Sequence, residues 1–297
     1  MPYSKPIDKI PSLVLYIAAG DGVSPGKVYQ VESTDGRVMG KQNFDQTPTG
    51  ISMYRDHGVV VTLPRDGGKV VEIDDKGKQS TILDKNSELP HPVKISMPGN
   101  SDTMVVADDM AHQLVMSTIA GTKTKVYQKL PQNCSSQPMS VAVANDKGGV
   151  FSSPADPGVH KFMGDQSASG DKPVLAASGG VAADHNSLRW AAAQAPHTIK
   201  IYEGTQFVKD LSLPSGKKFY KGGLLSFGPD GSVCVAVQDE NNEQADVWFL
   251  CYHFEKGKFS NNVSTLFKWT HEEIQDFAVG TRLPWDNHAP ASLKSTF

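Results

Sequence analysis

Acidic residues recur at intervals along this sequence, in short polar segments that each separate two apolar runs. Carboxylates gathered around one opening could bind a divalent cation or attract a basic partner. Aspartate in such a segment is also a common turn residue, because its side chain accepts hydrogen bonds from nearby backbone amides. The pattern favours the turn role over the binding role. The acidic candidates are Asp21, Asp66, Asp108, Asp109, Asp156, Asp239 and Glu240.

Metal-dependent chemistry would require several donors around one cation, six or more with water for a hard ion such as Ca²⁺. Asp276 is the first candidate ligand, with His91, Glu273, Gln137 or Asp21 as additional donors. The sequence contains no His-x-Glu-x-His motif and no Gly-x-Ser-x-Gly nucleophile elbow. We therefore predict no cofactor, with Ca²⁺ or Zn²⁺ as the alternative. The sequence leans against an enzyme without deciding the point.

The elements that must position these residues are marked by an apolar phrase that occurs six times. Its copies start 44, 46, 40, 44 and 52 residues apart, and further apolar runs separated by turn residues follow them. A strand-rich repeat of this length predicts four-stranded antiparallel blades of a β-propeller. The copies are Pro48–Met53, Pro92–Met97, Pro138–Val143, Ser178–Ala183, Gly222–Phe227 and Ile274–Val279.

The first unit lacks a phrase before its strands, and the last phrase follows the sixth unit. We therefore predict an all-β, six-bladed propeller closed by the C-terminal strand, which pairs with the N-terminal blade. A capping box at Thr270–Glu273 predicts a short helical turn before the closing strand. The blades of this single domain (1–297) are expected at 10–45 plus 274–279, 48–85, 92–130, 138–177, 178–215 and 222–268, with a surface tail at 284–297.

Positions within the phrase are expected to have different roles. The fourth and sixth positions are apolar in every copy and should pack between blades. Among the third positions, Lys94 and Asp276 could pair near the channel. We favour solvated strand ends instead, because charges at strand ends are usually exposed. The third positions are Gly50, Lys94, Ser140, Gly180, Leu224 and Asp276.

One unit resembles a known family. Met104–Gly121, MVVADDMAHQLVMSTIAG, resembles the NHL-type propeller repeat, and Pro48–Thr62 and Gly222–Val237 are similar to parts of it. The same outline occurs in the senescence-marker/gluconolactonase-like propellers. The first resemblance implies a binding platform for proteins, with RNA binding in a basic-faced subset. The second implies a divalent cation held over the channel by Glu, Asn and Asp, and hydrolysis of lactones or esters.

Composition narrows the choice of partner. The chain has 29 Lys+Arg against 32 Asp+Glu, a net charge of −3, which gives no reason to expect nucleic acid or an anionic membrane as partner. The longest apolar stretch near the start, Leu13–Ala19, is too short to span a membrane, and no signal-peptide pattern precedes it. The default expectation is a cytoplasmic protein, and the oligomeric state is left open.

Cys234 and Cys251 are expected to be two buried thiols and not to form a disulfide bridge.

The leading hypothesis is a non-enzymatic recognition module. It would bind a protein or a small-molecule ligand at the face around the channel mouth, or form a structural part of a larger assembly. The rigid ring that displays its loops and the lack of a catalytic cluster in the sequence support this reading. The alternative is a metal-dependent lactonase or esterase of the gluconolactonase-like type.

Overall fold

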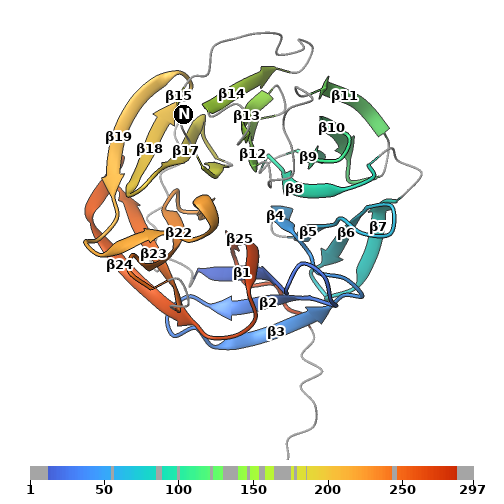
Figure 1. The fold of residues 1–297 in the computed structure, drawn as a ribbon, viewed down its shortest axis with the longest axis horizontal. Helices are drawn as coiled ribbons and strands as arrows, with labels where there is room; N and C mark the ends of the chain where they lie inside the picture. Colours follow the sequence, from blue (N-terminus) through green and yellow to red (C-terminus); the bar gives the residue numbers. More distant parts are fainter. Residues whose placement is uncertain are drawn as a thin grey trace, which may run out of the picture.

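The computed structural model describes residues 13–285, except 55–56, 85–88, 99–100, 121–122, 130–139, 146–147, 154–157, 164–174, 177–178, 185 and 243–245. The chain forms six antiparallel sheets arranged as a ring around a central axis (Figure 1). The predicted six-bladed propeller is therefore confirmed.

Each blade has an inner strand near the axis and an outer strand at the rim. Blade 1 contains β25 (Ile274–Gly280), β1 (Val14–Ala19), β2 (Lys27–Glu32) and β3 (Val38–Asn43). Blade 2 contains β4 (Gly50–Tyr54), β5 (Gly58–Leu63), β6 (Lys69–Asp74) and β7 (Gln79–Leu83). Blade 3 contains β8 (Pro92–Ser96), β9 (Thr103–Asp108), β10 (Gln113–Thr118) and β11 (Lys123–Lys129).

The other three blades follow in chain order. Blade 4 contains β12 (Ser140–Asn145), β13 (Gly148–Ser153), β14 (Gly158–Met163) and β15 (Leu175–Ala176). Blade 5 contains β16 (Val181–Ala183), β17 (Arg189–Gln194), β18 (Thr198–Glu203) and β19 (Gln206–Ser212). Blade 6 contains β20 (Lys217–Phe219), β21 (Leu225–Phe227), β22 (Val233–Asp239), β23 (Val247–Glu255) and β24 (Lys258–Trp269).

Blade 6 departs from the predicted four strands. Both β20 and β21 pair with β22, and a 3-10 turn, η2 (Tyr220–Gly222), separates them. The inner strand of this blade is therefore divided in two. The glycines at this break, Gly222 and Gly223, have φ angles of 76° and 110°, a region that L side chains rarely adopt.

The ring closes as predicted. Strand β25 pairs antiparallel with β1, with Phe277 opposite Ile17 and Val279 opposite Leu15. The two strands lie side by side although they come from opposite ends of the chain (Figure 1). Closure covers the inner edge of the N-terminal sheet, which would otherwise present unpaired backbone groups.

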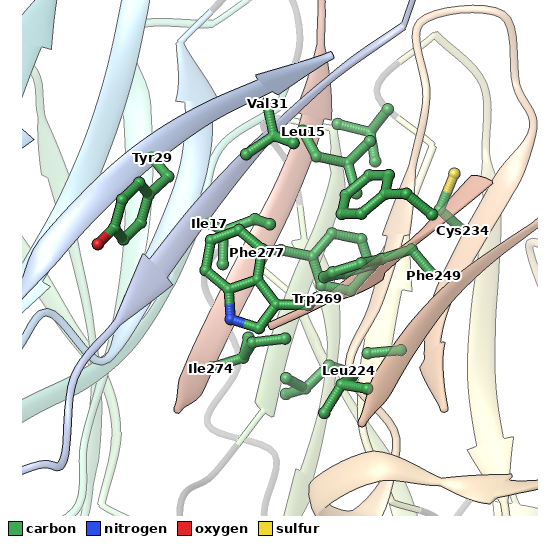
Figure 2. Close-up of a cluster of buried hydrophobic side chains, with 14 of the residues drawn as sticks. Leu15, Ile17, Tyr29, Val31, Leu224, Cys234, Phe249, Trp269, Ile274 and Phe277 are labelled. Carbon is green, nitrogen blue, oxygen red and sulfur yellow. The ribbon is translucent and has the colours of Figure 1, made fainter. Parts of the chain in front are cut away.

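The apolar core is divided into six clusters, one at each interface between neighbouring blades. The fourth and sixth phrase positions of each blade lie in the cluster shared with the preceding blade, so the predicted packing role is confirmed. Figure 2 shows the cluster between blades 6 and 1, where Phe277 meets Phe249 edge-on at 5.0 Å. Cys234 and Cys251 lie in the same cluster as buried free thiols.

The helical turn expected at Thr270–Glu273 is wrong, because these residues form a bend. The Glu272 carboxylate accepts hydrogen bonds from the side chains of Lys27 and Tyr29 on β2. Its backbone oxygen accepts the Trp269 indole N–H at 2.6 Å. The side chain and the backbone oxygen of Glu272 therefore bind groups of the neighbouring strands and do not cap a helix.

Beyond β25 the chain crosses from blade 1 to blade 2. Trp285, which belongs to the predicted surface tail, is buried, and its indole N–H donates to the Asp74 carbonyl at 3.0 Å. Its ring packs edge-on against Tyr16 at 5.3 Å. Pro284 is exposed, and residues 286–297 lie outside the described residues. No helix in the described ranges is long and apolar enough to cross a membrane.

Candidate binding cavity at the channel mouth

The candidate residues come from one face of the ring because of the strand register. Within a blade, the start of the inner strand lies opposite the end of the second strand, as Gly50 opposite Thr62 and Pro92 opposite Asp108. The loops that follow the second strands therefore surround the starts of the inner strands. We call this side of the ring the mouth face.

A cavity of about 630 Å³ lies along the axis, between the inner strands of all six blades. Its walls combine apolar side chains with several serine, lysine and aspartate side chains. This combination is typical of a site for a small molecule, and the volume lies within the usual range of about 300–1,000 Å³. One residue from each blade illustrates the lining: Ile51, Lys94, Ser140, Val181, Leu224 and Asp276.

Lys94 and Asp276 form an ion pair in this cavity. The Lys94 ammonium lies 3.2 Å from the Asp276 carboxylate and donates to the Gln275 carbonyl at 3.0 Å. The two residues come from blades 3 and 1, so the lysine reaches past blade 2. Blade 2 has a glycine, Gly50, at the corresponding position. A Cβ there would lie 2.8 Å from the Lys94 Cα, so a larger residue would clash with β8.

The expectation that Lys94 and Asp276 are solvated strand ends is wrong. Their side chains are only 10% and 13% exposed. These strands begin beside the axis, where the other blades surround them, and not at an outer surface. In a closed ring the start of an inner strand is an interior position.

Burial acts on both members of the pair. It lowers the pKa of Lys94, while the attraction and hydrogen bond of Asp276 oppose that shift. Burial likewise raises the pKa of Asp276, against the attraction of Lys94 and the hydrogen bond donated by the Ile51 backbone amide. Each charge is thus held in an environment that disfavours it and depends on its partner.

A set of hydrogen bonds near the axis joins neighbouring blades, and the sequence analysis missed it. At five interfaces a side-chain oxygen of one blade accepts the backbone N–H of the next inner strand; we call these the axial hydrogen bonds. They run to Ser52 from Met97 (3.1 Å), Ser96 from Val143 (2.9 Å), Ser140 from Val181 (3.0 Å), Ser226 from Val279 (3.0 Å) and Asp276 from Ile51 (3.1 Å).

The interface between blades 5 and 6 uses backbone alone. The Gly180 amide donates to the Gly222 carbonyl at 3.1 Å. A Cβ on Gly180 would lie 1.9 Å from the Gly223 carbonyl oxygen, so only glycine permits this approach.

The sequence did contain a signal for the close approach of the blades at the axis, because the fifth phrase position is small in every copy. These residues are Ser52, Ser96, Ala142, Ala182, Ser226 and Ala278.

Two of the predicted acidic residues are turn residues in the structure. Asp108 is buried, and its carboxylate accepts the backbone amides of His91 at 2.9 Å and Ala111 at 2.8 Å. The exposed Asp21 accepts the amides of Ser24 and Val23 at 2.6 and 2.8 Å. The bonds from Ser24, followed by the Val23 amide, lower the pKa of Asp21 to about 2.

The other predicted acidic residues are dispersed. Of this set only Asp109 lines the cavity among the described residues, and its carboxylate lies 2.5 Å from the His91 imidazole. Asp66 is exposed in a turn with φ of 55°. Asp239 pairs with a lysine at 2.5 Å and Glu240 lies 3.4 Å from a histidine. Asp156 lies outside the described residues.

The predicted metal ligands do not come together. In the described part of the chain, no three His, Cys, Asp or Glu side chains are placed to hold a metal ion. Asp276 faces the Lys94 ammonium, Glu273 pairs with Lys221 at 2.7 Å, and His91 faces Asp109. The Lys94 ammonium beside the Asp276 carboxylate would repel a divalent cation. The described donor set therefore does not fit Ca²⁺ or Zn²⁺. Gln137 lies outside the described residues.

Comparison with known proteins supports the fold and little else. No family model and no curated protein matches the chain. Among 727 matching solved chains is one from a crystal structure of a nidogen/laminin complex. It has a TM-score of 0.60 and 11% identity, over 92% of this chain and 99% of that chain. At this identity the likeness shows a shared propeller fold, and so widespread a fold does not select a function.

Proposed function

We propose that the protein is a non-enzymatic recognition propeller that binds its ligand in the cavity at the mouth face. The observation that carries this proposal is the cavity itself, with apolar walls and a buried ion pair at its inner wall. The resemblance of Met104–Gly121 to NHL-type repeats supports the same class, because those repeats mostly act as binding platforms.

The geometry disfavours the alternative of a metal-dependent lactonase. Such an enzyme would hold its cation with several oxygen ligands over the channel. Here the described carboxylates nearest the axis are engaged by Lys94, His91 and Lys221.

A protein partner at the same face is the second candidate. Val23 and Met110 lie in the loops that follow the second strands of blades 1 and 3, and they are 63% and 69% exposed. Exposed apolar residues on loops around an opening are suited to a partner surface. A propeller of similar fold occurs in the nidogen/laminin complex, which is a precedent for protein binding by this architecture.

Ligand-observed NMR with a library of small neutral and charged fragments tests the proposal. Leu224→Trp should occupy the part of the cavity beside blade 6 and remove the signals of fragments bound there. Leu188→Trp is the matched control, because Leu188 is 52% exposed in the loop between β16 and β17, at the opposite end of the strands. Fragments that bind the wild type and both variants equally, or no binding at millimolar concentration, would refute the proposal.

A further inference from the structure

We infer that the cavity binds an organic monoanion, with a carboxylate held by Lys94 and the hydroxyls of Ser52 and Ser96 and an apolar body toward blades 5 and 6. This inference rests on the proposed function and specifies its ligand class. Three observations carry it: unused donors on two neighbouring strands, a nearly neutral charge balance, and apolar side chains beside open space on the opposite side.

The first observation concerns hydrogen-bond donors. Lys94 has three N–H groups, and the described residues accept two of them, at the Gln275 carbonyl and the Asp276 carboxylate. Ser52 and Ser96 each accept an axial hydrogen bond, and the described residues offer no acceptor for either hydroxyl proton. All three side chains line the cavity and are at least nine-tenths buried.

These donors come from two neighbouring inner strands, β4 and β8. Lys94 and Ser96 are two residues apart on β8, so they project from the same face of the strand. Ser52 occupies the same phrase position as Ser96 on the neighbouring strand β4. Gly50, the counterpart of Lys94 on β4, lets the two strands approach closely, since a Cβ there would lie 2.8 Å from the Lys94 Cα. Donors without acceptors in a low-dielectric cavity favour a ligand that brings acceptor oxygens.

The charge balance selects a monoanion. Asp276 has its carboxylate satisfied by Lys94 and the amides of Ile51 and Phe277, so it offers little acceptor capacity to a ligand. Two further charged side chains line the cavity, and each has a partner: Lys221 lies 2.7 Å from Glu273, and Asp109 lies 2.5 Å from the His91 imidazole. The Lys94 ammonium, partly neutralised by Asp276, can support one negative charge. A dianionic phosphate would normally need more cationic groups than this wall supplies.

The opposite wall can accommodate an apolar body. There is open space beside Gly222, where a Cβ would meet no atom within 4 Å. Leu224 and Phe277 line the cavity and supply apolar surface. A flat or short aliphatic group could therefore lie against these two side chains while its carboxylate reaches Lys94.

Titration calorimetry with matched probe pairs tests the inference. The probes are benzoate against benzamide and hexanoate against hexanamide, with phenyl phosphate as the dianionic comparison. We expect each carboxylate to bind about tenfold more tightly than its amide, as a charge-assisted hydrogen bond provides, and phenyl phosphate to bind no better than benzoate. Lys94→Met/Asp276→Asn should remove the preference for carboxylate, so that the carboxylate and the amide of each pair bind with equal affinity. Lys200→Met/Asp210→Asn, which neutralises an outer pair at 3.1 Å, should change neither.

The outcomes separate the two proposals. Equal affinity for carboxylate and amide, with both lost in Leu224→Trp, would overturn the anion inference and leave the binding cavity standing. No binding of any probe would overturn both. The carboxylate-to-amide ratio of the wild type decides the matter even where a variant fails to fold. Stronger binding of phenyl phosphate than of benzoate would refute the monoanion assignment.

Discussion

The ion pair between Lys94 and Asp276 yields the most specific stability prediction. Lys94→Met keeps most of the side-chain volume and removes the charge. Asp276→Asn removes the other charge and keeps an oxygen that can accept the Ile51 amide, now 3.1 Å away. We expect each single substitution to destabilise the fold strongly, and the double substitution to leave the stability near that of the wild type.

The magnitude follows from distance and burial. Two unit charges 3.2 Å apart attract by about 5 kcal/mol at an effective dielectric constant of about 20. Because the side chains are 10% and 13% exposed, the pair has also lost hydration worth several kcal/mol per ion. A single variant keeps one desolvated charge without its partner, so we expect a loss of about 3 kcal/mol, against about 1 kcal/mol or less for the double variant.

The pH dependence follows from the two pKa shifts. The pKa of Asp276 is raised in the fold above its ordinary value of 3.8, so its contribution to stability is present below that value and is lost as pH rises through the folded pKa. The pKa of Lys94 is lowered from 10.5, so its contribution is present above 10.5 and is lost as pH falls through the folded pKa. The double variant should therefore show a flatter stability profile between these limits.

Urea denaturation followed by tryptophan fluorescence measures all three variants. The control cycle uses Lys200 and Asp210, a more exposed pair for which coupling of less than about 1 kcal/mol is expected. If the two single losses at Lys94 and Asp276 add up in the double variant, the charges do not stabilise each other. Such additivity would refute the buried ion pair and the charge argument for the ligand.

Three further predictions concern the ring. Burial raises the pKa of Glu272, but the hydrogen bonds from Lys27 and Tyr29 on β2 outweigh this effect and lower the pKa to about 2. The stability of the protein should therefore fall as the pH falls from about 4.5 to 2. In a pH-denaturation profile, Glu272→Gln should flatten this part of the curve. Ser96→Ala leaves the buried Val143 amide without its acceptor and should cost about 1–3 kcal/mol in urea, whereas an unchanged midpoint would refute the axial hydrogen bond. Phe277→Ala in the closing strand should lower the stability by about 3–5 kcal/mol in the same assay. The control Phe207→Ala should lower it by less than about 0.5 kcal/mol, because Phe207 is 53% exposed. Equal effects of the two substitutions would refute closure through β25.

The fold could be predicted because its signals are local and repeated. The apolar fourth and sixth positions recur in every phrase, and a buried face on each inner strand requires them. The unpaired phrase at Ile274–Val279 indicated the closure, since one blade lacked an inner strand. The division of blade 6 was not predictable in the same way, because Gly222 and Gly223 are equally typical of a turn and of a strand start.

The site was harder to predict because its geometry is not local. Lys94 and Asp276 are 182 positions apart in the sequence, and only the closed ring brings them together. Residues of other blades bury these two side chains. The sequence of one strand alone does not show this burial, so both side chains were expected to be exposed to solvent. Conversely, Asp108 and Asp21 accept amides from residues near them in the chain or the same turn, which is why the turn role was visible in the sequence.

The axial hydrogen bonds also explain which residues are available to a ligand. In blades 2, 3 and 6 the fifth phrase position, always serine, joins the next blade. The third position of those blades is therefore released from that role, and it holds Gly50, Lys94 and Leu224. In blades 1 and 4 the third positions, Asp276 and Ser140, make the axial hydrogen bond themselves. The cation and one apolar contact of the cavity thus come from blades 3 and 6, whose third position does not make the axial hydrogen bond, while Gly50 of blade 2 permits the close approach of β8.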